Sequence, residues 1–142
     1  NGKKLDDFGI EKFVGNGILV DYRKQKVVEK VNVKITKGDI VLFYTGQSKK
    51  SKEDYGKDSP VISSSLAKEL VKKKIKMIGI DAFSPDNEPY EVHRMLLKND
   101  ILIVENLVNL GKLFGRRFQV FVLPLKLEGV DGSPCRAIAV TK

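Results

Sequence analysis

The residues best suited to chemistry are the only histidine of the sequence, His93, and the acidic residue Glu105, twelve positions later. The apolar segment 101–104 lies between them and ends directly at Glu105. A buried strand that ends on a carboxylate needs a positive charge beside it, because an unpaired buried carboxylate is costly. Imidazole nitrogen and carboxylate oxygen are both ligands of divalent transition metals. The pair therefore indicates a candidate metal site.

Both residues also have ordinary structural interpretations, and the sequence leaves these open. A single histidine on a short amphipathic helix is usually a packing or hydrogen-bonding residue. Glu105 could form an ion pair with an arginine, for which the sequence offers Arg94, Arg116 and Arg117.

Other polar residues occupy positions where α/β proteins often place site residues. Asp81 ends a predicted strand, and Ser84 follows it in a Ser-Pro-Asp loop that ends at Asp86. Asp131 and Ser133 flank a glycine in a turn-rich segment. We expect Asp81, Ser84, Asp131 and Ser133 to support the site or line its pocket. Each of them, like Asp86, can equally be a turn or capping residue.

Length and composition describe an ordinary folded chain. Its 142 residues can bury a substantial core, and we expect one domain over 1–142. No apolar run approaches the roughly 20 residues of a membrane-spanning helix, so no membrane association is expected. One cysteine, Cys135, excludes an internal disulfide framework and is typical of a reducing compartment, which predicts a cytoplasmic protein. The sequence begins with Asn1 rather than methionine, and we expect it to be part of a longer polypeptide.

The net charge of +8 raises the question of nucleic-acid binding. The lysines concentrate in short runs, 49–52 and 72–74, and the first run is followed by acidic residues. Neither an RNA-binding aromatic signature nor a zinc-finger spacing is present. A lysine-rich solvated surface is therefore the simpler interpretation, and nucleic acid is not the expected partner.

The hydrophobic pattern predicts strands interspersed with short helices, which is typical of an α/β domain. Strands are expected at 16–21, 40–44, 77–81, 101–104, 118–123 and 136–140, with 40–44 central in the sheet. An amphipathic helix is expected at 63–74 with a serine N-cap, and a shorter one at 90–98 with Pro89 as its first helical residue. Segment 24–33 reads as a half-exposed strand or a short turn–strand unit, and 45–60 as a long loop.

An ordered set of motifs resembles the cyclase-type metal-dependent hydrolases, the family that includes bacterial kynurenine formamidase, an arylformamidase of tryptophan catabolism. The motifs are GKKLDDFGIEKFVGNGILVD (2–21), GDIVLFYTG (38–46), GIDAFSPD (79–86), PYEVHRMLL (89–97), IVENLVNL (103–110) and LPLKLEGVDGSPCRAIAV (123–140). Together they span nearly the whole chain. The resemblance implies a swivelling β/β/α domain, with a mixed, partly barrel-like sheet and short flanking helices.

The resemblance also implies site residues. In the family, the residues that match His93 and Glu105 are metal ligands, with zinc or manganese as the ion. The remaining ligands and the proton-transferring histidine belong to a motif of the form HxGTHxDxPxH, which in the family lies just before the segment matching 3–20. This sequence does not contain that motif. His93 and Glu105 would be two ligands of a larger set.

The expected function is hydrolysis of a small amide, such as N-formylkynurenine or a related cyclic amide, by the full-length protein. This chain alone is expected to be inactive, and the family resemblance implies a dimer or tetramer. Two other functions remain open. The chain could be a non-catalytic small-molecule-binding or assembly module of the same fold, or a basic nucleic-acid-binding domain.

Overall fold

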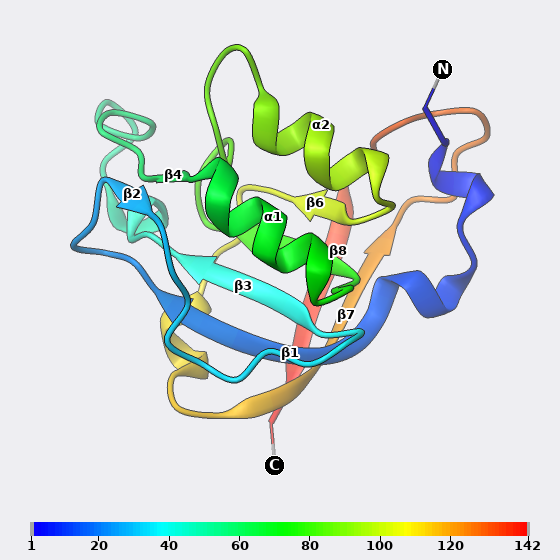
Figure 1. Cartoon of the computed structure of the whole chain (residues 1–142), viewed down its shortest axis with the longest axis horizontal. Coiled ribbons are helices and arrows are strands. Elements are labelled where there is room, and N and C mark those ends of the chain that lie inside the picture. The colour runs from blue at the N-terminus through cyan, green and yellow to red at the C-terminus, as the bar shows by residue number, and fades with distance from the viewer. Residues whose placement is uncertain (1, 142) are drawn as a thin grey trace.

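The computed structural model describes residues 2–141 as a curled mixed sheet, resembling half a barrel, with two α-helices packed on one side (Figure 1). The strand order of this six-stranded sheet is β6-β5-β3-β1-β7-β8. Its strands are β1 (Val14–Asp21), β3 (Ile40–Tyr44), β5 (Met77–Ile80), β6 (Leu102–Val104), β7 (Arg117–Pro124) and β8 (Cys135–Val140). The α-helices are α1 (Ser64–Lys72) and α2 (Glu91–Lys98). The expected α/β fold, with a mixed, partly barrel-like sheet and short flanking helices, is confirmed.

Smaller elements connect these strands and helices. A separate two-stranded parallel sheet joins β2 (Val27–Val28) to β4 (Val61–Ile62). Short 3-10 helices are η1 (Leu5–Asp7), η2 (Ile10–Phe13), η3 (Gln47–Lys49) and η4 (Leu110–Leu113). Within residues 2–141, every helix is too short or too polar to cross a bilayer.

Strand direction determines where polar side chains gather. β1, β3, β5 and β6 are parallel to one another, whereas β7 runs antiparallel to β1 and β8 antiparallel to β7. The carboxyl ends of the four parallel strands therefore meet at one edge of the sheet. Asp21, Thr45, Asp81 and Glu105 stand at or just after these ends. This edge is where open α/β sheets bind their ligands.

The core consists of two hydrophobic clusters, one on each face of the sheet. The cluster under the helices includes Phe43, Ile78 and Leu66. The cluster on the opposite face includes Leu42 and Val120. Every residue of β3 is buried, because helices cover one face and η4 with neighbouring side chains covers the other. The prediction that 40–44 forms a central strand is confirmed.

Local sequence signals account for α1. The Ser63 hydroxyl accepts a hydrogen bond from the backbone N–H of Leu66 at 3.2 Å, as expected of an N-cap serine. Leu66 and Leu70 are fully buried against the sheet, while Lys72 in the last turn suits the negative end of the helix dipole.

One local prediction is wrong, and the structure selects between the two alternatives of another. Pro89 is not the first residue of α2, because the helix begins at Glu91 and Tyr90 is its N-cap residue in a left-handed conformation (φ 58°). The carboxylate of Asp86 accepts the N–H groups of Val92 and His93, and this contact fixes the start of the helix. Segment 24–33 contains only the two-residue strand β2, which matches the turn–strand alternative rather than a longer strand.

Candidate metal centre

His93 and Glu105 come together at the edge where the parallel strands end. His93 lies on α2, and Glu105 immediately follows β6. The contact between α2 and β6 brings Nε2 of His93 within 3.5 Å of Oε1 of Glu105. Their side chains are 26% and 32% exposed, so a ligand can reach both of them from solvent.

The facing atoms are chemically suited to a shared cation. Asp86 contacts Nδ1 of His93 through its Oδ1. A carboxylate only accepts, so Nδ1 carries the proton, and Nε2 of the neutral ring has a free electron pair directed at Glu105. Two acceptors that face each other need a proton or a metal ion between them. Metal–ligand bonds of about 2.1 Å at a tetrahedral angle place two ligands roughly 3.4 Å apart, close to the observed 3.5 Å.

Asp86 holds this arrangement in place. Its Oδ2 accepts hydrogen bonds from the backbone N–H groups of Val92 at 2.8 Å and His93 at 3.3 Å, while Oδ1 contacts the imidazole. The side chain is only 8% exposed. One carboxylate thus caps α2 and orients the ring that the helix carries, the arrangement typical of a residue that supports a metal-ligating histidine.

The electrostatics of His93 agree with this geometry. The neighbouring carboxylates of Glu105 and Asp86 raise the pKa of His93 above its usual 6.5 and outweigh burial, which acts in the opposite direction. The site therefore favours a positive charge between the two acids, either as a proton on the ring or as a bound cation.

Within residues 2–141, no ion pair joins Glu105 to an arginine. Arg117 instead binds Asp39, with Nη1 donating to Oδ1 at 3.0 Å. Among residues 2–141, the recorded charged partner of Glu105 is His93.

Asp81 lies at the same edge but is directed into the protein rather than toward His93. It is completely buried after β5 and accepts hydrogen bonds from the turn that follows β3. Its Oδ1 accepts from the N–H and hydroxyl of Thr45 at 2.6 and 2.7 Å, and its Oδ2 accepts from the hydroxyl of Ser48 at 2.9 Å and the N–H of Gly46 at 3.0 Å. Asp81 therefore fixes the first residues of the loop after β3.

Ser84 shapes the loop that presents Asp86. Its hydroxyl donates to the backbone carbonyl of Asp86 at 2.5 Å and accepts from the backbone N–H of Asp86 at 3.3 Å. Both residues are buried. Ser84 thus influences the candidate metal centre indirectly, because it fixes the position of Asp86.

Asp131 and Ser133 line a cavity that Glu105 also lines. The cavity has a volume of about 560 Å³, and its lining includes Glu105, Asp131, Ser133 and Cys135. Much of the remaining lining is apolar side chains from β5, β6 and β7. Burial raises the pKa of the Cys135 thiol. The two turn residues therefore share the lining of one cavity with Glu105, and His93 is not part of that lining.

Several residues of this region have no clear local signal in the sequence. Tyr55, in the loop after β3, donates its hydroxyl hydrogen bond to Oδ1 of Asn106, the residue next to Glu105. The two residues are 51 positions apart, and Tyr55 lies outside the motifs given above, whereas Asn106 belongs to IVENLVNL. Asp86 could have been found only through its position before a helix, because an acidic residue there is a common cap.

The described ligand set is small. Between residues 2 and 141, no group of three or more histidine, cysteine, aspartate or glutamate side chains has the arrangement of a complete metal site. The residues present fit part of such a site, since His93 and Glu105 offer two ligand atoms to one position and Asp86 is engaged with the ring and the helix.

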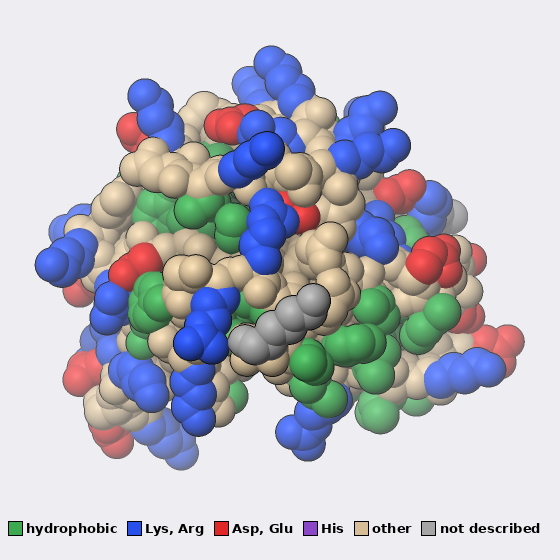
Figure 2. Space-filling view, turned by 90° about the horizontal axis from the view of Figure 1, so that it is seen from below, with side chains coloured by type: hydrophobic (Ala, Val, Ile, Leu, Met, Phe, Trp, Pro, Cys, Tyr) green, Lys and Arg blue, Asp and Glu red, His purple; other side chains and the backbone are tan. Residues whose placement is uncertain are grey.

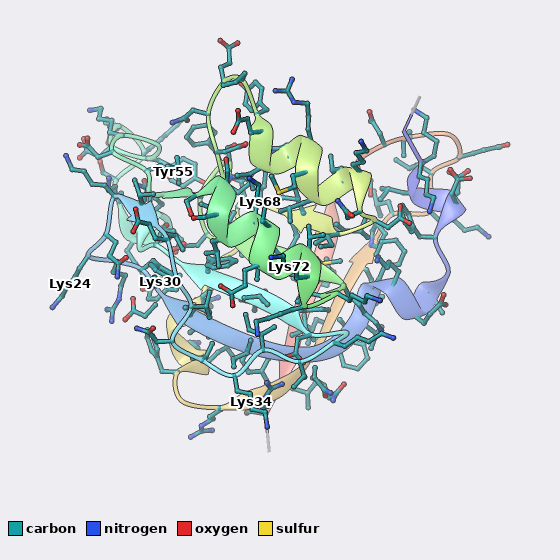
Figure 3. The ribbon with its side chains drawn as sticks, in the orientation of Figure 1. Lys24, Lys30, Lys34, Tyr55, Lys68 and Lys72 are labelled. Atoms are coloured by element: carbon teal, nitrogen blue, oxygen red, sulfur yellow. The ribbon has the colours of Figure 1, made fainter. Side chains whose placement is uncertain are left out.

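Five of the exposed lysines lie on other elements than His93 and Glu105. Lys68 and Lys72 project from α1, and Lys24, Lys30 and Lys34 project from the segment between β1 and β3 (Figure 3). These five lysines therefore do not belong to the candidate metal centre, whereas the exposed Lys98 is on the same helix as His93.

Comparison with known proteins links the chain to one family. The family described as "Putative cyclase" matches residues 1–87, a range that ends before His93 and Glu105. An uncharacterized protein of Methanocaldococcus jannaschii is 42% identical over 104 residues, which cover 72% of this chain and 54% of that protein. A kynurenine formamidase of Bacillus thuringiensis is 31% identical over 146 residues, covering 97% of this chain and 68% of the enzyme.

Solved structures agree with the sequence comparison. A structure described as a potential metal-dependent hydrolase with cyclase activity superimposes with a TM-score of 0.83 at 26% identity, covering 97% of this chain and 70% of the other. This chain thus spans 54% to 70% of the length of these proteins. Its fold, including the segment that carries His93 and Glu105, is shared by longer relatives.

Proposed function

Because this chain belongs to the putative cyclase family, we propose that His93 and Glu105 are metal ligands of a hydrolase that cleaves a small amide. The substrate class we propose is an N-formyl aryl amide of the N-formylkynurenine type, or a related cyclic amide. Similarity to a kynurenine formamidase supports this class. Similarity to a structure described as a metal-dependent hydrolase supports the use of a metal.

One observation carries the proposal. Nε2 of His93 and Oε1 of Glu105 face each other at 3.5 Å with Nδ1 already occupied by Asp86. An imidazole electron pair and a carboxylate oxygen therefore face the same small space, which solvent can reach. Neither side chain needs to move far to bind the same ion.

The chemistry divides between the ion and the chain. Zinc or manganese, when bound, would supply Lewis-acid activation of a water molecule and of the amide carbonyl. His93 and Glu105 hold that charge at the strand edge, and Asp86 keeps the imidazole turned toward it. The cavity beside Glu105 offers space of about 560 Å³ for a small substrate.

Further ligands are needed for catalysis. Catalytic zinc sites use three protein ligands, and structural sites use four. The motif HxGTHxDxPxH supplies the others in the family, and it is absent from this sequence. We therefore propose that amide hydrolysis requires a protein that also contains this motif, and that the 142-residue chain alone binds zinc weakly.

Metal content tests the ligand assignment. In the protein that contains the motif, Glu105→Ala should remove the retained metal measured by elemental analysis, together with formate release from N-formylkynurenine. Glu53→Ala, a change in an exposed glutamate of the loop after β3, is the matched control and should leave both unchanged. Unchanged metal content in Glu105→Ala would refute the assignment. Stoichiometric zinc in the 142-residue chain would show that the ligand set is different.

We also propose that the protein forms a homo-oligomer. Hydrophobic side chains lie exposed between lysines and arginines on the face away from the helices (Figure 2). Exposed leucines at the end of β7 and beyond it, namely Leu123, Leu125 and Leu127, would be covered by a subunit contact. Light scattering coupled to size-exclusion chromatography measures the mass, and a monomer at high protein concentration would contradict the proposal.

A further inference from the structure

Three partly exposed aromatic side chains lie near the candidate metal centre. Tyr55 is 37% exposed, and Phe83 and Tyr90 are each 47% exposed. They come from three different segments: the loop after β3, the loop after β5 and the residue before α2. None of the three belongs to either hydrophobic core cluster. Packing of the hydrophobic core therefore does not account for the position of these three side chains.

Tyr90 is in contact with the imidazole. The ring centroids of Tyr90 and His93 are 5.8 Å apart, and the ring planes are nearly perpendicular at 88°. Tyr90 is the N-cap residue of α2, so the helix that carries His93 also positions this ring. One aromatic ring thus stands at the histidine side of the site.

Tyr55 reaches the glutamate side. Its hydroxyl donates to Oδ1 of Asn106, which directly follows Glu105. The backbone N–H of Asn106 donates at 2.9 Å to the carbonyl of Ala82, the residue before Phe83. Tyr55 and Phe83 therefore approach the end of β6 from two neighbouring segments. Figure 3 shows Tyr55 projecting from the loop near the end of the molecule where α2 begins.

Phe83 packs against the loop that carries Tyr55. A β-carbon added at Gly56 would lie 3.2 Å from Cε1 of Phe83, so the glycine allows close contact between the loop and the ring. The N–H of Gly56 also donates to Oε1 of Gln47 at 3.1 Å, and Gln47 is itself buried. The contact between Gly56 and Phe83 and the hydrogen bond between Gly56 and Gln47 therefore both position the loop that carries Tyr55.

We propose that Tyr55, Phe83 and Tyr90 form an aromatic subsite that binds the aryl ring of a small ligand beside His93 and Glu105. The proposal rests on the proposed function for the reaction that follows binding, but ring binding itself does not require the metal. Exposed aromatic side chains beside a histidine–carboxylate pair suit a planar aromatic amide, because offset and edge-on ring contacts add to the burial of apolar area. An aliphatic ring of similar size gains only the burial.

The test compares two ligands that differ in aromaticity. N-phenylformamide and N-cyclohexylformamide have the same formamide group and similar size. NMR titration of the metal-free chain measures both dissociation constants, with the ring protons of the single histidine as the reporter. We expect the phenyl compound to bind more tightly. Phe83→Leu and Tyr90→Leu should each reduce this preference by about 3- to 10-fold.

Two further variants separate ring contact from other effects. Tyr55→Phe removes the hydrogen bond to Asn106 but retains the ring, so the aryl preference should survive, whereas Tyr55→Leu should weaken it. Phe114→Leu is the matched control, because Phe114 is a 40% exposed phenylalanine that packs on Tyr44 and Arg23 elsewhere on the surface. It should leave the preference unchanged.

The outcomes distinguish this proposal from the proposed function. Equal binding of the two rings, binding of neither, or a preference that persists in all three leucine variants would overturn the aromatic subsite. Loss of metal binding alone would leave it standing, since the titration uses metal-free protein. Conversely, an intact aryl preference would not rescue the ligand assignment if Glu105→Ala retained its metal.

Discussion

Replacing Asp86 with asparagine tests how the candidate metal centre is built. The change keeps the shape of the side chain but removes its charge and one acceptor oxygen. Asparagine can still accept a hydrogen bond through Oδ1, but its amide nitrogen cannot accept from either the helix or the imidazole. The variant can therefore keep both contacts only if the imidazole proton moves from Nδ1 to Nε2, which removes the free electron pair opposite Glu105.

The structure gives the expected size of the effect on stability. A helix cap contributes about 0.5–2 kcal/mol, and a hydrogen bond to a charged group about 1.5–3 kcal/mol. Since one acceptor remains, we expect Asp86→Asn to lower the free energy of unfolding by about 1.5–3 kcal/mol. For a domain of this size, that corresponds to a fall in Tm of roughly 4–10 °C.

Part of this loss should depend on pH. The pKa of His93 is raised in the folded protein, so the charged imidazole stabilises the fold. That contribution is fully present below the unfolded value near 6.5 and is lost as the pH rises through the folded value. Asp86→Asn removes the share of it that Asp86 provides. The Tm difference between wild type and variant should therefore be larger at pH 5.5 than at pH 9.

The assay is direct because the sequence contains one histidine. The ring proton signals of His93 give its pKa by NMR, and thermal unfolding at the two pH values gives the stability difference. Asp7→Asn is the matched control. Asp7 also accepts a backbone N–H, from Lys4 at 2.7 Å, but it lies in η1 and not at the imidazole. An unchanged pKa of His93 in Asp86→Asn, with equal Tm differences at both pH values, would refute the reasoning.

Two further predictions concern the strands that position the site. Gly79→Ala should lower the free energy of unfolding by about 1–3 kcal/mol in chemical denaturation, because the new β-carbon would lie 2.5 Å from Cδ2 of Leu42. Gly132→Ala, where nothing lies within 4 Å, should have little effect, and equal stability of the two variants would contradict this account. Asp81→Asn should cost about 2–4 kcal/mol and increase amide hydrogen exchange at the turn after β3, because a buried charged acceptor is lost. The exposed Asp54 is the control, and protection that persists in Asp81→Asn would count against a role in fixing the turn.

Local sequence signals were sufficient for much of the fold. The fully apolar run of β3 predicted a central strand because both of its faces are covered. The serine before α1 and the leucines at helical spacing predicted that helix, and both signals act within a few residues of the chain. By contrast, only two residues of segment 24–33, those of β2, form a strand. The alternation of charged and apolar residues could not predict this length, because it does not show whether a partner strand is present.

The candidate site was predictable by residue type and position, but not by its contacts. His93 and Glu105 were identified because they are an imidazole and a carboxylate, and the end of a strand is a place where such groups gather. The contact between Tyr55 and Asn106 joins residues 51 positions apart and depends on how the loop after β3 folds back. Asp81 was expected near the site, yet its hydrogen bonds go to the turn at Thr45.

The wrong start predicted for α2 and the unforeseen contact of Asp86 with the imidazole have one physical cause. Proline at the first helical position is a local preference, and it predicts Pro89 when only neighbouring residues are considered. The carboxylate of Asp86 reaches past the intervening residues to the N–H groups of Val92 and His93, so the helix starts where that acceptor allows. Because the same carboxylate contacts the ring of His93, the start of the helix and the direction of the imidazole are set together. A change that shifts the first turn of α2 should therefore also disturb the position of Nε2 opposite Glu105, even if neither His93 nor Glu105 is itself substituted.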